Sequence, residues 1–168
     1  MMSVSSIVED LYRTVREQLF TYALSITGDP SLSEDVVQDV FRRLCQEPVD
    51  AGDLRSYVFR SVRNRALDHV RLKSRRSVRG DDTGWASIYR SDAASPEERM
   101  VSAETARQVQ AALYGLEPDE RECIVLHIYG EMTFEMMSKV LEAPMGTVAS
   151  RYRRGLAKLR EALGREMP

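Results

Sequence analysis

Several residue types and segments are scarce in this sequence of 168 residues. It has two cysteines, Cys45 and Cys123, and two histidines, His69 and His127, far apart along the chain. Without a Cys and His cluster, a structural zinc site is not expected. Both cysteines lie among apolar neighbours in helical patterns, which predicts buried, reduced thiols. No run of about 18 apolar residues occurs, so we expect no insertion into a membrane.

Targeting and catalytic signals are also missing. The N-terminal stretch MMSVSSIVEDLYR lacks the basic start and apolar core of a secretory signal, so we expect a cytoplasmic protein. The sequence has no paired carboxylates beside a histidine, no phosphate-binding glycine loop and no GxSxG motif. An enzyme is therefore the least expected class, and we expect no cofactor and no metal.

Charge is unevenly distributed, although the net charge is only −2. Residues 51–80 hold nine Lys and Arg against two Asp and Glu, and residues 151–168 hold six against two. The stretch between them is acidic, because residues 81–122 hold four Lys and Arg against ten Asp and Glu. Two basic blocks, each within a helical pattern, suggest two contacts with one polyanion such as nucleic acid. A solvated helix face is the alternative for either block.

Apolar residues recur at steps of three and four, and no convincing alternating strand is found, which predicts an all-α protein. Ser33, followed by two acidic residues, is a good start for the second helix, and Asp53 and Thr133 are good caps for later ones. The expected helices cover about 4–27, 33–46, 54–76, 97–115, 118–130, 133–141 and 144–163.

One stretch, 77–96, has no periodicity and contains Gly, Ser, Asp and Pro. About 20 structureless residues inside one compact domain would be unusual. The sequence therefore predicts two small helical domains, 1–76 and 97–168, joined by a flexible linker.

The C-terminal pair of helices, 133–141 and 144–163, is joined by a very tight turn. Two short helices so connected form a helix-turn-helix, whose second helix enters the DNA major groove. Thr147, Ser150 and Arg153 lie away from the apolar stripe of this second helix, where side chains reach base edges and phosphates. The alternative is a solvated basic helix in an ordinary bundle.

The helix over 54–76 has two faces. Its apolar residues cluster on one side, while Tyr57, Arg60, Asn64 and Arg71 lie on the other. Arginines beside an aromatic ring and an amide form a platform for a strand backbone and unstacked bases. A solvated arginine face is again the alternative.

Two longer stretches resemble a known family. SEDVVQDVFRRL followed by LRSYVFRSVRNRALDHVRLKSRR resembles region 2 of bacterial sigma factors. LEPDERECIVLHIYGEMTFEMMSKVLEAPMGTVASRYRRGLAKLREAL resembles their region 4. The order, the linker and the length are similar to those of the extracytoplasmic-function (ECF) group of the sigma-70 family, which keeps only these two domains.

The resemblance implies a transcription initiation factor that binds core RNA polymerase, recognises the −35 and −10 promoter elements and melts the DNA. Region 4 would also contact the flap of the β subunit, and an anti-sigma factor is a further implied partner. The residues implied to bind the β′ clamp helices are Asp35, Gln38, Asp39, Phe41 and Arg42. Those implied for the −10 element are Tyr57, Arg60, Arg63, Asn64 and Arg71. Those implied for the −35 element are Thr147, Ser150, Arg151, Arg153 and Arg154.

The sequence departs from the family's pattern in a few positions. Near the position where the family has a tryptophan, this chain has Tyr57 and Phe59. Met136 replaces a capping glutamate, and Ala149 replaces a basic residue. Glu142 replaces the glycine of the turn, and its left-handed backbone would cost roughly 1–2 kcal/mol. Two alternatives stay open: a stand-alone helix-turn-helix regulator, and a sigma mimic that binds an anti-sigma factor.

Overall fold

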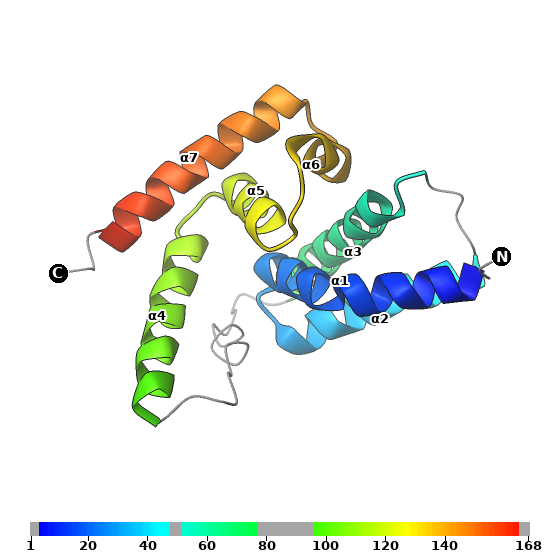
Figure 1. Cartoon of the computed structure of the whole chain (residues 1–168), viewed down its shortest axis with the longest axis horizontal. Helices are drawn as coiled ribbons and strands as arrows, with labels where there is room; N and C mark the ends of the chain where they lie inside the picture. The colour runs from blue at the N-terminus through cyan, green and yellow to red at the C-terminus, as the bar shows by residue number, and fades with distance from the viewer. Residues whose placement is uncertain (1–3, 48–51, 77–95, 165–168) are drawn as a thin grey trace.

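A computed structural model of the chain describes residues 4–47, 52–76 and 96–164 (Figure 1). Within these ranges the protein consists of helices and turns, with no strand, which confirms the all-α prediction. The seven helices are α1 (Val4–Thr27), α2 (Pro30–Gln46), α3 (Leu54–Arg76), α4 (Pro96–Tyr114), α5 (Pro118–Ile128), α6 (Phe134–Leu141) and α7 (Met145–Gly164).

The first three helices form one bundle, in which α1, α2 and α3 each pack against the other two (Figure 1). Their periodic apolar residues meet in the centre and are almost fully buried. The central side chains are Val15, Leu19, Val36, Val37, Val58, Phe59, Val62 and Ala66. The apolar stripes read from the sequence therefore do form the core of this unit.

The start of α2 differs from the prediction. The helix begins at Pro30 rather than near Ser33, because the Asp29 carboxylate caps it by accepting a hydrogen bond from the Leu32 amide at 3.1 Å. Proline suits this first helical position, where its missing N–H would have no partner in the helix. The Ser33 hydroxyl, buried one turn into α2, donates to the Asp29 carbonyl at 2.7 Å.

The second unit contains α4 to α7 and includes the predicted helix-turn-helix. Thr133 caps α6 by accepting from the Met136 amide at 3.2 Å, as expected. Glu142 follows α6 with φ 51° and ψ 43°, the left-handed conformation predicted for it. Gly155 lets α7 cross close to α5, since a Cβ there would stand 3.2 Å from the Cβ of Glu120.

The two units pack against each other through α1 with α5 and α3 with α6. Buried apolar side chains from both units, among them Phe59 and Met137, belong to one continuous cluster. The predicted linker, 77–96, lies outside the described residues except for Pro96, which begins α4.

The two cysteines differ in their surroundings. Cys123 is buried, and burial raises the pKa of its thiol to about 11. Cys45 is exposed, so the prediction that both thiols are buried was wrong for it. Cys45 lies one position beyond buried Leu44, at the edge of the apolar stripe of α2.

The described residues also answer two questions raised by composition. None of their helices is both long and apolar enough to cross a membrane. Nor do these residues contain a group of three or more His, Cys, Asp or Glu side chains that could hold a metal ion.

Candidate nucleic-acid interface

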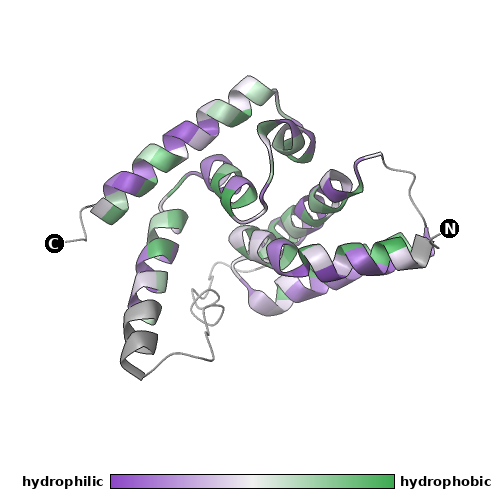
Figure 2. Cartoon of the chain, in the orientation of Figure 1, coloured by the Kyte–Doolittle hydropathy of each residue, from purple (hydrophilic) through white to green (hydrophobic). Residues whose placement is uncertain are grey.

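The helix α7 is held in place by its apolar side. Val148 is buried, and Tyr152 meets the ring of His127 edge-on at 4.7 Å between ring centres. Phe134 stacks on the same His127 ring at 5.1 Å and meets Tyr152 edge-on at 5.5 Å, so the three rings form one cluster. Hydrophilic and hydrophobic residues alternate along α7 (Figure 2). The apolar face of the helix packs against α5 and α6.

Three cations of α7 are paired with carboxylates of α5. Arg151 Nη2 lies 2.7 Å from Asp119 Oδ2. Glu120 is almost buried and binds both Lys158 Nζ at 2.8 Å and Arg154 Nε at 3.4 Å. The hydrogen bond from Lys158 is the main reason that the pKa of Glu120 lies below its ordinary value.

The remaining predicted residues of α7 are less constrained. Arg153 and Thr147 are exposed and Ser150 is half-buried. In the described part of the chain, Arg153 has no carboxylate within ion-pair distance, unlike Arg151 and Arg154. Among the predicted −35 residues, Arg153 thus has no carboxylate partner within the described residues, whereas Arg151 and Arg154 form ion pairs with carboxylates of α5.

The predicted −10 residues divide between two sides of α3. Tyr57 and Asn64 line a cavity of about 340 Å³ between α2 and α3. Arg65, which the sequence analysis did not select, also lines this cavity, and its Nη2 lies 2.8 Å from Asp39 Oδ2. An aromatic ring, an amide and a guanidinium therefore surround one space.

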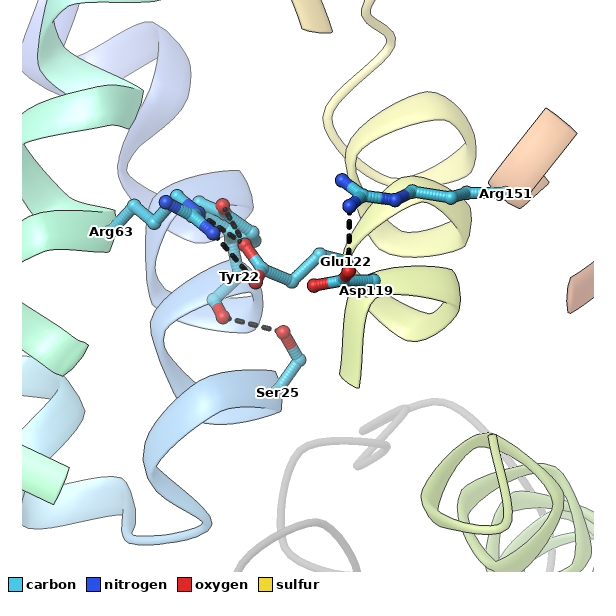
Figure 3. A network of polar contacts seen from close by, with 6 residues as sticks. All are labelled: Tyr22, Ser25, Arg63, Asp119, Glu122 and Arg151. Atoms are coloured by element: carbon cyan, nitrogen blue, oxygen red, sulfur yellow. Dashed lines mark hydrogen bonds and ion pairs between the residues drawn. The ribbon is translucent and has the colours of Figure 1, made fainter. Parts of the chain in front are cut away.

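Arg63 lies on the other side of α3, where it faces α5 (Figure 3). Its Nε and Nη2 donate to the two carboxylate oxygens of Glu122 at 2.7 and 3.2 Å. The Tyr22 hydroxyl of α1 donates to the same carboxylate at 2.7 Å. The side chains of Arg63 and Glu122 are only 18% and 8% exposed, so this is a buried ion pair between the two units.

Burial and charge act on the pKa values of this group. Burial by itself lowers the pKa of Arg63, but the hydrogen bond and charge of Glu122 outweigh it, so the pKa rises. Burial, followed by the charge of Glu122, raises the pKa of Tyr22 well above its ordinary value. Arg63 therefore stays charged, and Tyr22 remains a hydrogen-bond donor.

The last two predicted −10 residues are more exposed. Arg60 lies 6.0 Å above the ring of Tyr57 and 3.9 Å from Glu142, across the contact between the units. Arg71 lies 3.7 Å from Asp68, and the two side chains are 71% and 61% exposed. Such a solvated pair contributes little to stability, so Arg71 is available to a ligand.

On α2 the predicted polymerase-binding residues also separate by exposure. Asp35, Gln38 and Arg42 are exposed. Phe41 is 6% exposed and packs edge-on against Tyr12 at 4.8 Å, so its main contacts are in the core. Half-buried Asp39 binds Arg65, as described above, and also lies 3.4 Å from Arg43.

The two arginine-bearing helices, α3 and α7, both lie in segments that match models of a known protein family. The family model for Sigma-70 region 2 matches residues 11–76, and the model for Sigma-70, region 4 matches residues 106–159. The chain belongs to the sigma-70 family. Region 2 thus corresponds to the bundle of α1 to α3, and region 4 includes the helix-turn-helix of α6 and α7.

Similar proteins place the chain in the ECF group. The ECF RNA polymerase sigma factor SigK of Mycolicibacterium vanbaalenii is 27% identical over 91% of this chain and 80% of its own. The ECF RNA polymerase sigma factor SigE of Mycolicibacterium smegmatis is 26% identical over 94% of this chain and 62% of its own. The chain is an alternative sigma factor, a class of transcription initiation factor.

Two solved structures share the fold. Sigma factor RpoE of Bartonella quintana, solved with the anti-sigma factor NepR, matches with a TM-score of 0.70 and 22% identity. The match covers 95% of this sigma factor and 99% of that chain. CnrH, solved with the cytosolic domain of CnrY, matches with a TM-score of 0.65 and 24% identity, over 95% and 89% of the two chains.

The acidic residues of α5 are the part of this sigma factor that sequence analysis missed. Asp119, Glu120 and Glu122 were counted only as members of an acidic block. Each of them pairs with an arginine or lysine at least 32 positions away, in region 2 or in α7. The one available signal was the alternation of basic and acidic blocks, which the sequence analysis interpreted as contacts with a polyanion or as solvated faces rather than as charge pairing.

Proposed function

We propose that this sigma factor binds core RNA polymerase and directs it to promoters through separate contacts with the −10 and −35 elements. The main support is the presence of two arginine-bearing helices, α3 and α7, in the two sigma regions. Nothing in this function requires catalysis by the chain, so we propose that it is not an enzyme and acts beside the polymerase in the cytoplasm.

The proposed polymerase surface is the exposed side of α2 with the adjoining groove. Asp35, Gln38 and Arg42 offer charge and hydrogen bonds to a protein partner. Val8 and Tyr12 contribute to a groove of about 360 Å³ beside them. An apolar groove with polar side chains at its rim is suited to a partner helix.

The proposed −10 site combines the cavity between α2 and α3 with the arginines of α3. An unstacked base gains stacking and hydrogen bonds when it enters such a pocket, and Tyr57 and Asn64 supply these two interactions. Arg60, Arg63 and Arg71 would neutralise backbone phosphates of the opened strand. Binding of the single strand then drives melting without ATP.

The proposed −35 site is α7 in the major groove. Arg153 is free to grip guanine O6 and N7 with two hydrogen bonds. Glu120 holds only the Nε of Arg154 at 3.4 Å, which leaves the terminal nitrogens for DNA. We therefore propose that Glu120 positions Arg154, while Thr147 and Ser150 contact the base edges or phosphates nearby.

An anti-sigma factor is a second proposed partner. The support is the fold shared with RpoE and CnrH, whose solved structures contain NepR and CnrY.

In vitro transcription tests the proposed function. Core polymerase from the bacterium that makes the chain is incubated with and without it on a library of genomic fragments. We expect new transcripts that depend on the chain and share −35 and −10 sequences. A chain that does not co-elute with core polymerase and yields no transcript would favour the stand-alone regulator, or the sigma mimic if it captures an anti-sigma factor.

A further inference from the structure

The first turn of α7 carries an exposed apolar side chain. Met145 begins the helix and is 56% exposed, more than any other large apolar side chain of the described residues. The other exposed ones, Ile7, Leu72 and Ile128, belong to α1, α3 and α5. Single apolar residues on a surface are common and need no partner. Met145 differs from these three because it begins the helix that is proposed to enter the major groove.

Helical periodicity aligns Met145 with two further residues of α7. Side chains four positions apart lie on the same side of a helix, so Met145, Ala149 and Arg153 follow one line. Met145 and Arg153 are exposed, and Ala149 is half-buried. This Met145 line (Met145, Ala149 and Arg153) thus consists of two apolar side chains followed by an arginine.

The cations about half a turn around α7 from the Met145 line have partners within region 4. Arg151, Arg154 and Lys158 all pair with carboxylates of α5. In the part of the chain that the structure describes, Arg153 has no carboxylate within ion-pair distance. The Met145 line therefore combines exposed apolar surface with an arginine that is available to DNA.

The Met145 line also contains one of the positions at which this chain departs from the family's pattern. Ala149 stands where a basic residue is usual. Alanine provides no ligand for a phosphate or for guanine, and it leaves a methyl group beside Met145. In the major groove, the base feature that suits an apolar side chain is the C5 methyl group of thymine.

We propose that Met145 and Ala149 form an apolar subsite for the C5 methyl group of a thymine in the −35 element, beside the guanine site of Arg153. This inference rests on the proposed function in taking α7 as the −35 helix. It adds the chemical group that the first turn of this helix recognises.

The length of the Met145 line sets the spacing between the two bases. Eight residues of helix rise about 12 Å, which corresponds to roughly three base steps of about 3.4 Å each. The thymine should therefore lie within about three base pairs of the guanine that Arg153 contacts. A helix that lies obliquely in the groove shortens this spacing and does not lengthen it.

The apolar contact has a definite expected strength. Met145 is hydrated in the free chain, and contact with the thymine methyl group removes apolar surface of both partners from water. The flexible methionine side chain can adapt to the position of the methyl group. Burial of one such group is worth about fourfold in affinity.

Replacement of thymidine by deoxyuridine tests the inference, since the two nucleosides differ only in the C5 methyl group. The protein is the full-length chain bound to core polymerase, and the DNA is a promoter selected from the genomic library. Each thymidine of its −35 element is replaced in turn, on either strand, and the modified promoter competes with the unmodified one. We expect one position, or two neighbouring ones, at which replacement weakens binding about fourfold.

Met145→Ala is the principal variant, because it removes most of the apolar subsite. It should bind the thymidine and deoxyuridine promoters equally. Met145→Leu keeps an apolar side chain of similar size and should keep the preference for thymidine. Ile128→Ala is the matched control: Ile128 is 49% exposed, belongs to the same region and ends α5 rather than beginning α7. It should discriminate as the parent does.

Ala149→Arg restores a basic residue in the middle of the Met145 line. The longer side chain should displace the methyl contact and reduce the effect of deoxyuridine. It should also steepen the salt dependence of binding by about one released counterion. Ala157→Arg adds the same charge at an exposed position two turns further along α7, and it should keep the effect of deoxyuridine.

A methyl group on another base provides an independent readout. At the position that the deoxyuridine scan identifies, the thymine pair is replaced by a cytosine pair, with or without a C5 methyl group on the cytosine. The methylated promoter should bind the parent about fourfold more tightly than the unmethylated one. Met145→Ala should bind both equally.

Two results would overturn the inference: no thymidine whose replacement alters binding, or an equal effect of replacement in the parent and in Met145→Ala. The proposed function fails in a different way. A polymerase complex without any −35 preference contradicts α7 as the −35 helix. A parent that keeps a −35 preference but ignores every C5 methyl group contradicts only this inference.

Discussion

The two basic helices of this sigma factor, α3 and α7, hold their arginines in different ways. On α7, Arg151 and Arg154 pair with Asp119 and Glu120, which belong to the neighbouring helix of the same region. On α3, Arg63 pairs with Glu122 of the other region. Acidic residues of one short helix, α5, thus serve both basic helices, from opposite sides.

The difference has a consequence for DNA binding. Carboxylates within region 4 move together with α7, so they orient its arginines whether or not the two regions are in contact. The carboxylate on Arg63 belongs to the other region. The arginines of α7 proposed for the −35 element are therefore oriented by region 4 alone, whereas Arg63, proposed for the −10 element, is held by a side chain of the other region.

The largest expected effect is that of Arg63→Ala. It leaves Glu122 buried without its cation, so the free energy of unfolding should fall by about 3 kcal/mol. Formation of the open promoter complex should fail as well, because a proposed phosphate contact is lost. Urea unfolding and permanganate footprinting at the −10 element measure these two effects.

Arg71→Ala is the matched control on α3, since its pair with Asp68 is solvated. It should leave stability within about 0.5 kcal/mol of the parent while weakening contact with DNA. Equal stability losses in Arg63→Ala and Arg71→Ala would contradict the contrast between a buried and a solvated arginine.

Sequence periodicity predicted the local structure well, because helices are encoded by neighbours three and four positions apart. The bounds of α1 and α3, the Thr133 cap and the left-handed Glu142 all follow from short-range chemistry. The start of α2 did not, since Asp29 and Ser33 are both good capping residues and only the proline between them favours the earlier one.

The pairing of Arg63 with Glu122 could not be predicted from the sequence. The two residues are 59 positions apart, and their meeting depends on how two complete helical units pack. On a helical wheel, Arg60, Arg63 and Asn64 all lie outside the apolar stripe of α3. Asn64 lines a cavity because α2 lies on one side of α3, and Arg63 forms an ion pair because α5 lies on the other side.

A smaller effect is expected on α7, where Arg153→Ala removes the arginine that has no carboxylate partner in the described structure. Discrimination at one or two −35 positions should fall by roughly 1–3 kcal/mol, the value of a bidentate contact with guanine. Arg160→Ala, an exposed arginine near the end of the same helix, should instead weaken all sequences equally.

A promoter-library transcription assay compares these two variants of α7 with the parent. If Arg153→Ala keeps the −35 preference of the parent, the helix serves a protein partner rather than DNA. Such a result would mean that α7 does not bind the −35 element, and α3 would remain as the proposed DNA-binding helix.

Glu142→Gly tests the solvated contact between Glu142 and Arg60 across the two regions. Relief of the left-handed strain should stabilise the chain by about 1 kcal/mol, less a few tenths for the solvated pair with Arg60. Glu131→Gly is the control, because Glu131 has the same φ of 51° and no ion pair within the described residues. Calorimetric melting should show a larger gain for Glu131→Gly than for Glu142→Gly. Equal gains in the two variants would show that the contact of Glu142 with Arg60 does not contribute to stability.

The smallest effect concerns pH and the carboxylate beneath α7. Lys158 and Arg154 hold the pKa of Glu120 below its ordinary value, so the stabilisation is present above about pH 4.3 and is lost as the pH falls through the lowered value. Both cations are at least half exposed, which limits the contribution to less than about 1 kcal/mol. Urea midpoints measured between about pH 6 and pH 3 should therefore fall more steeply for the parent than for Glu120→Gln. Glu117→Gln, at an exposed residue just before α5 that makes no side-chain capping bond, is the control and should keep the slope of the parent. Glu120→Gln should also broaden the −35 preference, because Arg154 loses its orientation, and a variant with the parent's slope and preference would show that α5 does not position the arginines of α7.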